Sequence, residues 1–292
     1  MIEKEQKQKI AEKLKVAREN FTGSDARFAI SLGINNAQYS RVKNGQTEKV
    51  LSEQNWISLA RRLDVDLFSN RIWNTARTPV YQFISKQLEM CQENGISSLL
   101  CDLSDIGKTY TAELYSKTHK NAVYIDCSQV KSKQRLIRFV AKSFGVGATG
   151  RYVDVYEDLV FFLRTLSNPL IIFDEFGDLN SDAVLECKAL WNGARNCAFY
   201  VMGADGLENR MRRSIDNKKV GYSELFSRFG KRYGKVVPIP VDDRKRVLQS
   251  TAMMIIKANS DGKDSMKIFR GTLGDDGRPS LRRIYNELSK IN

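Results

Sequence analysis

The sequence predicts an α/β fold with a parallel, doubly wound sheet, an all-α domain before it and a helical lid after it. Three observations support this prediction. Short apolar runs alternate with helical patterns through the middle of the chain, as in parallel sheets with helices on both faces. Before residue 68, helical patterns follow one another without an intervening strand. After Asp242, three further helical stretches follow.

These patterns also give the expected domain boundaries. Residues 1–68 form the first helical domain and 69–95 a connector helix. Residues 96–239 form the α/β core, and 240–292 the lid.

Composition narrows the class of protein and its partners. The 292 residues carry a net charge of +13, which favours an anionic macromolecule or surface as the partner. No apolar run approaches the length of a membrane span, so we expect no membrane contact and a cytoplasmic protein. The five cysteines form no C-x-x-C pair and are expected to be buried free thiols. His119 is the only histidine, which excludes mechanisms that need a histidine pair.

The first helical region has the pattern of a helix-turn-helix. Ser24 can cap one helix, Gly33 permits a tight turn, and Asn36–Lys43 forms the next helix. Amphipathic helices are expected on either side, over Glu3–Asn20 and around Trp56. The pattern resembles the lambda-repressor-like family, whose second helix of the pair enters the DNA major groove. The alternative is a small bundle for protein contacts. The exposed, groove-contacting residues are expected to be Asn36, Gln38, Tyr39, Arg41 and Lys43.

A second motif lies at the start of the α/β core. An apolar strand at Ser97–Leu103 leads to a polar turn, and Gly107-Lys108-Thr109 then opens a helix. This is most of a phosphate-binding P-loop, in which backbone N–H groups surround a polyphosphate. Lys108 would neutralise the β- and γ-phosphate oxygens, and the Thr109 hydroxyl would bind Mg²⁺. We therefore expect ATP and Mg²⁺ as cofactors.

Asp102 stands where the P-loop pattern has its first glycine. Aspartate enters the left-handed backbone region more readily than most residues, so we expect the loop to close around it. We also expect its carboxylate to lie near the phosphates. Like charge would then make ATP binding weak and strongly dependent on Mg²⁺.

A third motif supports nucleotide binding. Pro169–Phe173 is a buried-strand run that ends in Asp174 and Glu175, the arrangement of a Walker B motif. Asp174 at the strand end can hold Mg²⁺, and Glu175 can polarise an attacking water. The alternative is a P-loop fold that no longer binds its ligand.

The remaining elements of the core complete the alternation. Strands are expected at residues 122–126, 198–203 and 235–239, and helices at 108–117, 132–144, 152–166 and 182–193. Residues 117–151 contain eight lysines and arginines but a single acidic residue, Asp126. This excess of positive charge favours binding to a phosphate backbone. The candidate contacts in this stretch are Lys131, Lys133 and Arg135.

With these motifs in order, the chain resembles an AAA+ ATPase. More narrowly, it is similar to the DNA-transposition ATPases typified by the target-selecting B protein of phage Mu, a bacterial or phage-encoded family that also carries an N-terminal helix-turn-helix. The resemblance implies ATP-dependent filaments on double-stranded DNA that recruit and stimulate a transposase. The alternatives are a replication initiator or helicase loader, and a nucleotide-gated DNA scaffold with little hydrolysis.

The same resemblance assigns three further residues. Arg228, in Leu225-Phe226-Ser227-Arg228-Phe229, matches the arginine that AAA+ proteins present to a neighbouring subunit's nucleotide. Arg282 matches the nucleotide-contacting arginine of the lid, with Arg283 or Arg278 as alternatives. Asp205 is the polar residue available after the strand at 198–203.

Overall fold

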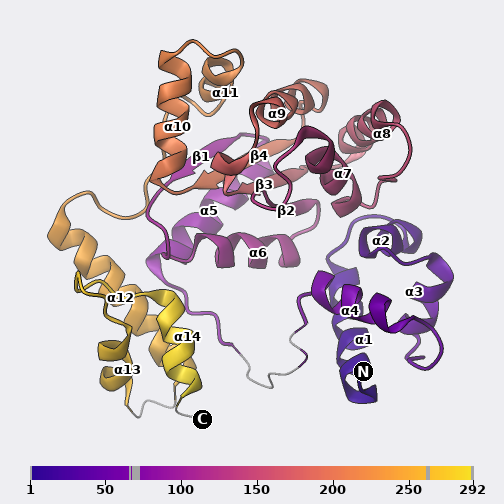
Figure 1. Ribbon diagram of the computed structural model, residues 1–292, viewed down its shortest axis with the longest axis horizontal. Coiled ribbons are helices and arrows are strands. Elements are labelled where there is room, and N and C mark those ends of the chain that lie inside the picture. Colours follow the sequence, from indigo (N-terminus) through magenta and orange to yellow (C-terminus); the bar gives the residue numbers. More distant parts are fainter. Residues whose placement is uncertain (1, 66, 68–72, 261–263, 291–292) are drawn as a thin grey trace.

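The computed structural model describes residues 2–65, 67, 73–260 and 264–290. Figure 1 shows a helical bundle near the N-terminus, a central sheet covered by helices, and three helices near the C-terminus. The expected boundary between residues 68 and 69 falls outside the described residues.

The N-terminal bundle contains the predicted tight turn between two short helices. Ser24 accepts a hydrogen bond from the Arg27 amide at the start of α2, and Gly33 ends that helix at a φ of 72°. Asn35 then starts α3 with a reciprocal capping box to Gln38. Within residues 2–65 the helices are α1 Lys4–Glu19, α2 Asp25–Leu32, α3 Asn36–Lys43 and α4 Glu53–Arg62.

One residue expected on the surface of α3 is buried, so that prediction was wrong. The Tyr39 side chain is 1% exposed, and its ring meets the ring of Phe28 edge-on at 5.6 Å. Because α3 packs against both α1 and α2, the face that includes Tyr39 and Val42 turns into the bundle core. The other predicted polar residues of α3 remain at the surface, Gln38 partly so.

The central sheet is parallel, as the sequence predicts. Its strand order is β1-β4-β3-β2, with all three neighbouring pairs parallel. Asp126 at the end of β2 is the register partner of Asp174 at the end of β3. The residues that follow the strands therefore gather at one edge of the sheet. The strands are β1 Ser98–Cys101, β2 Ala122–Asp126, β3 Leu170–Asp174 and β4 Ala198–Gly203.

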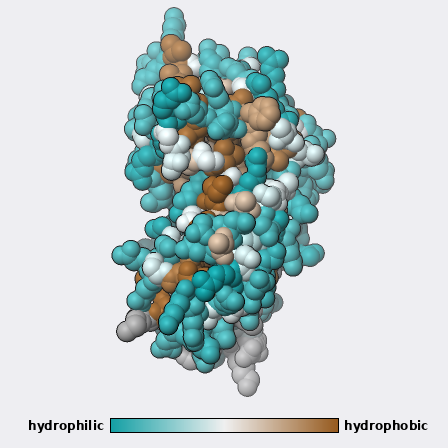
Figure 2. Space-filling model, turned by 90° about the vertical axis from the view of Figure 1, so that its right-hand side faces the viewer, coloured by the Kyte–Doolittle hydropathy of each residue, from teal (hydrophilic) through white to brown (hydrophobic). Residues whose placement is uncertain are grey.

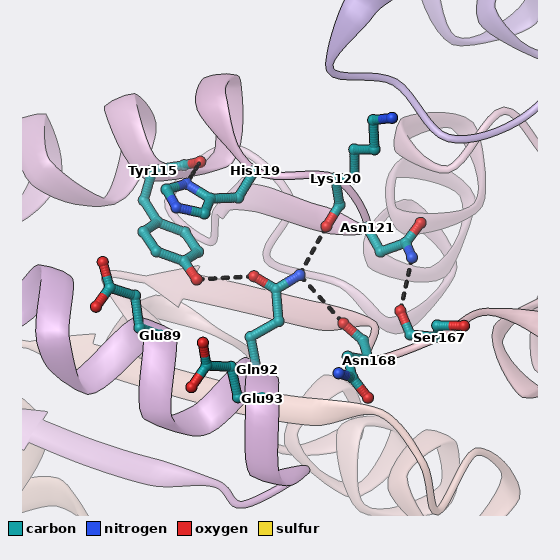
Figure 3. Close-up of a pocket in the computed structure, with 9 residues that line it drawn as sticks. All are labelled: Glu89, Gln92, Glu93, Tyr115, His119, Lys120, Asn121, Ser167 and Asn168. Atoms are coloured by element: carbon teal, nitrogen blue, oxygen red, sulfur yellow. Dashed lines mark hydrogen bonds between the residues drawn. The ribbon is translucent and has the colours of Figure 1, made fainter.

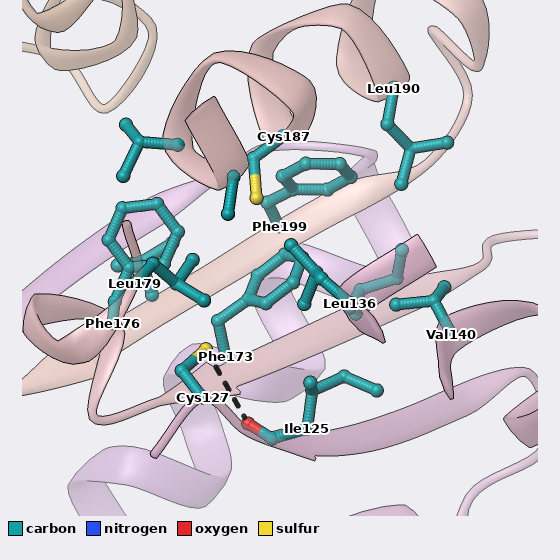
Figure 4. Close-up of a cluster of buried hydrophobic side chains, with 14 of the residues drawn as sticks. Ile125, Cys127, Leu136, Val140, Phe173, Phe176, Leu179, Cys187, Leu190 and Phe199 are labelled. Carbon is teal, nitrogen blue, oxygen red and sulfur yellow. Dashed lines mark hydrogen bonds between the residues drawn. The ribbon is translucent and has the colours of Figure 1, made fainter. Parts of the chain in front are cut away.

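Successive side chains of each strand enter two different cores, which makes the sheet doubly wound. Ile171 and Phe173 of β3 face one core, and Leu170 and Ile172 the other. In the first core, drawn in Figure 4, the rings of Phe173 and Phe199 lie 5.2 Å apart. The helices beside this face are α7 Lys133–Ser143, α8 Tyr152–Thr165, α9 Ser181–Gly193, α10 Asp205–Asp216 and α11 Tyr222–Arg228.

The predicted strand at residues 235–239 is absent. The chain pairs with β1 through a single bridge, in which the Gly234 amide donates to Leu99 O at 2.8 Å. Beyond Gly234, the amides of Val236 and Val237 donate instead to the buried carboxylate of Asp102. A side chain thus takes the backbone donors that a fifth strand would have used. β1 is also shorter than predicted, because it starts at Ser98 and ends at Cys101.

The second face is covered by α5 (Pro79–Asn94) and α6 (Lys108–Thr118). The helix expected to be a connector, α5, packs on the sheet through Val80, Ile84 and Leu88. Near the end of α5, the buried side-chain amide of Gln92 accepts a hydrogen bond from the Tyr115 hydroxyl at 2.7 Å. Its nitrogen donates to Lys120 O and Asn168 O (Figure 3). The same residues line an open pocket of about 400 Å³ at the edge of the sheet opposite the strand C-termini.

The predicted lid consists of three helices with a small core of their own. α12 (Val241–Asn259), α13 (Ser265–Thr272) and α14 (Leu281–Ser289) bury Ile256, Ile268 and Ile284 against one another. The five cysteines are free and buried, as expected, and burial raises the pKa values of the Cys91 and Cys101 thiols to about 12. Among the described residues, no helix combines the length and the apolar composition needed to cross a membrane.

Candidate functional site

The loop after β1 places the ammonium of a lysine against two of its own backbone carbonyl oxygens. Gly107 and Asp105 adopt positive φ values of 97° and 58°, which turn the chain from the strand into α6. Lys108, the first residue of α6, is 6% exposed. Its ammonium donates to Asp102 O at 2.9 Å and to Leu103 O at 2.5 Å. Burial lowers its pKa, although nearby carboxylates, that of Asp174 first, oppose this effect.

The two predicted halves of the nucleotide site meet at the sheet edge. Thr109 and Asp174 are 65 positions apart in sequence, yet the Thr109 hydroxyl donates to Asp174 Oδ2 at 2.6 Å. A hydroxyl and a carboxylate are oxygen ligands of the kind that Mg²⁺ takes beside nucleotide phosphates. The residues present therefore fit Mg²⁺ held by Thr109 and Asp174, with Lys108 beside it for the phosphates.

Glu175 has an unusual backbone conformation. It lies at the end of β3 with a φ of 48°, in the left-handed region, and its amide donates to Asp174 Oδ1 at 2.9 Å. Such a conformation in a residue other than glycine costs about 1–3 kcal/mol and is enriched at functional sites. Desolvation and the adjacent Asp174 carboxylate raise the pKa of Glu175, which makes it a better proton acceptor once ionised.

Tyr124 belongs to this site, but the sequence analysis missed it. Its hydroxyl donates to Asp174 Oδ2 at 3.0 Å, so Asp174 Oδ2 accepts from both Thr109 and Tyr124. The carboxylate raises the pKa of Tyr124, in addition to burial. The sequence places Tyr124 in the strand predicted at residues 122–126. That it reaches Asp174 could be predicted only by knowing that β2 pairs with β3.

The loop closes around Asp102 as expected, but the residue itself is arranged differently from the expectation. It is not among the residues with positive φ, and its carboxylate points away from the loop interior. Oδ1 accepts from Leu103 N at 2.7 Å, while Oδ2 accepts from Val236 N at 2.5 Å and Val237 N at 2.8 Å. These contacts do not support the predicted repulsion between this carboxylate and the phosphates, because three backbone amides already bind it. Asp102 instead ties the P-loop to the segment that leads into the lid.

The lid contacts the P-loop through Asp105. Its carboxylate accepts from the Ser280 hydroxyl at 2.7 Å and from the Arg282 amide at 3.3 Å, at the first turn of α14. The Arg282 side chain is exposed, and the structure gives it no partner among the described residues. The two alternatives are engaged elsewhere, Arg283 with Leu273 O and Arg278 with Asp276. This favours Arg282 as the lid's contact to a nucleotide.

Arg228 makes contacts away from the P-loop, whereas the Asp205 carboxylate is among the charges that raise the pKa of Lys108 against the effect of burial. Arg228, at the end of α11, donates to Asn192 Oδ1 and lies 5.2 Å from the centre of the Trp191 ring. Arg228 thus contacts α9 of its own chain. The Asp205 carboxylate pairs with Lys235 at 2.9 Å at the start of α10.

The candidate DNA contacts fall into two groups. On α3, Arg41 donates to Gln46, and Lys43 pairs with Asp25 at 2.9 Å, while Gln38 keeps its amide nitrogen for other partners. The second group, beside α7, is partly neutralised. Lys131 lies 3.5 Å from Asp178, Lys133 lies 3.8 Å from Glu186, and Arg135 has no ion pair among the described residues.

The comparison with protein families identifies the central part of the chain. Residues 97–211 match the family model described as an AAA domain. This part of the chain is similar to AAA domains. The match runs from just before β1 into α10, and it includes the P-loop and Asp174 with Glu175. It supports, for residues 97–211, the predicted resemblance to the AAA+ proteins.

Similarity to individual proteins is low. No curated protein matches the chain. Among solved structures, the Orc1 protein of Aeropyrum pernix in complex with DNA aligns at 15% identity with a TM-score of 0.46. The alignment covers 75% of this chain and 66% of that chain, so the present chain spans about two thirds of the length of that protein.

The Asp102 contacts lead to a prediction opposite to that from the sequence. Asp102→Gly should weaken ATP binding and lower the free energy of unfolding by about 3 kcal/mol, because three backbone amides lose a buried carboxylate partner. Asp102→Asn keeps one acceptor oxygen and should lie between the wild type and the glycine variant. Titration with a fluorescent ATP analogue and urea denaturation measure the two effects. Tighter ATP binding by Asp102→Gly would restore the repulsion model.

Proposed function

We propose that the protein is an ATP-dependent, DNA-binding AAA+ ATPase that serves DNA transposition. The observation that carries the ATPase part is the hydrogen bond from Thr109 to Asp174 at 2.6 Å, beside the buried ammonium of Lys108. This arrangement brings a phosphate-binding cation and two Mg²⁺ ligands to one sheet edge inside an AAA domain.

The residues of the site divide the work of ATP hydrolysis. Lys108 exchanges its loop carbonyl partners for phosphate oxygens, and Gly107 leaves room for the backbone to approach them. Thr109 and Asp174 hold Mg²⁺, which when bound neutralises phosphate charge. Glu175 polarises the attacking water, and its raised pKa suits it to accept a proton. Arg282 approaches the phosphates from the lid.

DNA binding is proposed from the bundle and from α7. The exposed face of α3 offers Gln38, Arg41 and Lys43 to a major groove, and the start of α7 offers Lys131, Lys133 and Arg135 to phosphates. Asp178 and Glu186 partly neutralise Lys131 and Lys133, so one subunit alone should bind DNA phosphates weakly. We therefore propose that strong binding requires several subunits assembled on one duplex.

The transposition part of the proposal supplies the partners. ATP-bound subunits assemble as a helical filament or ring on target DNA, and the assembly recruits and stimulates a transposase. Its support is the order of the parts, with the helix-turn-helix bundle before the AAA domain, together with an arginine at the end of α11.

Duplex binding should be strengthened by ATP and be steeply dependent on salt, with little dependence on sequence. Lys108→Ala should abolish both ATP binding and its effect on DNA, because the phosphates lose their cation. Glu175→Gln should keep ATP-stimulated DNA binding and lose hydrolysis. Electron microscopy of the protein on duplex DNA, with and without ATP, would show the assembly. Flat affinity between low and moderate salt would exclude phosphate-backbone binding.

Arg228→Ala should leave ATP binding by the monomer intact and abolish both assembly and hydrolysis. The reason is that a guanidinium supplied by the neighbour couples the subunits through the nucleotide. Sedimentation with ATP and DNA measures assembly. Arg232→Ala, which removes an exposed arginine four positions further on, is the matched control. Normal assembly of the Arg228 variant would remove this residue from the site.

The identity of the partner distinguishes transposition from the other AAA+ roles. With ATP and duplex DNA present, the protein should stimulate strand transfer by a transposase encoded beside it. Lys108→Ala is the control, and it should give no stimulation. Loading of a replicative helicase instead would assign the protein to replication.

A further inference from the structure

The bundle is packed against the AAA domain through specific contacts. In Figure 1 it lies beside α7, and α2 packs directly on that helix. The Arg27 guanidinium lies 3.9 Å from the centre of the Phe162 ring of α8. The chain at Gly145, just after α7, passes so close to Arg27 that a Cβ at this glycine would collide with the Arg27 carbonyl. The two parts thus form a defined seam.

Positive charge is concentrated at this seam. Arg61 and Arg62 end α4, and Lys142 lies in the last turn of α7. Arg62 donates to Ser31 O near the end of α2, and α2 packs on α7, the helix that carries Lys142. In agreement with this packing, burial lowers the pKa of Lys142, and the charges of Arg62 and Arg61 lower it further. Among the described residues, neither Arg61 nor Lys142 has an ion-pair partner.

Arg62 is held in place but not neutralised. Its Nη1 donates to Ser31 O at 2.9 Å, and the guanidinium packs against Gly33 in the turn before α3. Its Nε is buried and has no hydrogen-bond partner in the described part of the chain. A buried guanidinium N–H without an acceptor is costly, so the bundle leaves the charge of Arg62 only partly satisfied.

Two acids of the bundle, Asp64 and Asp25, already form ion pairs with other cations. Asp64, two residues after Arg62, pairs with Lys117 of α6 at 2.7 Å. Asp25, at the start of α2, pairs with Arg18 and with Lys43. The repulsion among the three seam cations is therefore not offset by these carboxylates.

We propose that Arg61, Arg62 and Lys142 form a phosphate-binding seam for the backbone of duplex DNA. This inference rests on the proposed function and adds to its two groups of candidate DNA contacts a third. Duplex DNA is favoured because the seam lies between the two groups of candidate DNA contacts. On one side, Gly33 leads into α3. On the other, Arg135 lies seven positions before Lys142 on the same face of α7.

The seam makes the orientation of the bundle part of the DNA interface. The cations come from α4 and from α7, so a phosphate between them is bound only while the two parts are packed together. Figure 2, which views the molecule from the right-hand side of Figure 1, shows a mainly hydrophilic surface with apolar groups gathered along the middle of this face.

The test compares the double variant Arg61→Gln/Lys142→Gln with the wild type. Lys267→Gln is the control, since it removes one exposed positive charge from α13 in the lid. Fluorescence anisotropy of a labelled duplex is measured over a salt series with ATP present. The double variant should reduce the log–log salt slope by about 1.8, or about 0.9 for each phosphate that is no longer neutralised, and the control should leave it unchanged.

Thermal unfolding separates a phosphate site from a structural role. Without DNA, the double variant should melt at the same temperature as the wild type or higher, because it relieves repulsion between like charges. A lower melting temperature would mean that these cations hold the domains together, and would overturn the proposal.

Gly145→Ala tests the same seam without removing a charge. The added Cβ meets the Arg27 carbonyl and should displace α2 from α7, with a loss of salt slope similar to that of the double variant. Gly150→Ala is the matched control, since this glycine also has a positive φ but no atom within 4 Å of the added Cβ.

The outcomes separate this inference from the proposed function. If the wild type fails to bind duplex DNA at any salt concentration, the proposed function fails and the seam fails with it. If the wild type binds and the seam variants bind as the controls do, the seam alone is overturned.

Discussion

The parallel pairing of β1, β4 and β3 is the constraint on which the candidate site depends. Parallel strands end at the same edge, so the P-loop after β1 and the carboxylates after β3 are brought together although 65 positions separate Thr109 from Asp174. Both faces of the sheet are then buried beneath helices, which fixes the strands in register. The cores on the two faces hold the groups of the site in place without contributing chemistry.

Three charged residues are buried at this edge, and each has found partners. Lys108 donates to two carbonyls, Asp102 accepts from three amides, and Asp174 accepts from two hydroxyls and an amide. Burial of an unpaired charge would cost several kcal/mol. Since each of these groups is satisfied by the fold, the loop keeps its shape while Lys108 remains able to exchange carbonyl partners for phosphate oxygens.

The sequence predicts the parts of the site whose signal is local. Gly107-Lys108-Thr109 and the run that ends in Asp174 are short motifs, and the structure places them together. The residues that reach across the fold were missed, because nothing near Tyr124 or Asp105 indicates its partner. Asp102 was misjudged for the same reason: its carboxylate binds the Val236 amide, 134 positions away. Tyr39 was misjudged because a short helix packed on two others buries a wider face than an isolated amphipathic pattern suggests.

The contact between Asp105 and the first turn of α14 couples the P-loop to the lid. The backbone of Asp105 lies in the left-handed region, inside the loop that a nucleotide would contact, while its carboxylate holds the first turn of a nine-residue helix. At 1.5 Å per residue that helix is about 13 Å long, so a rotation of about 20° at its start carries its far end through about 5 Å. A rearrangement too small to disturb the sheet is thus enlarged at the outer surface of the lid, where another molecule can sense it.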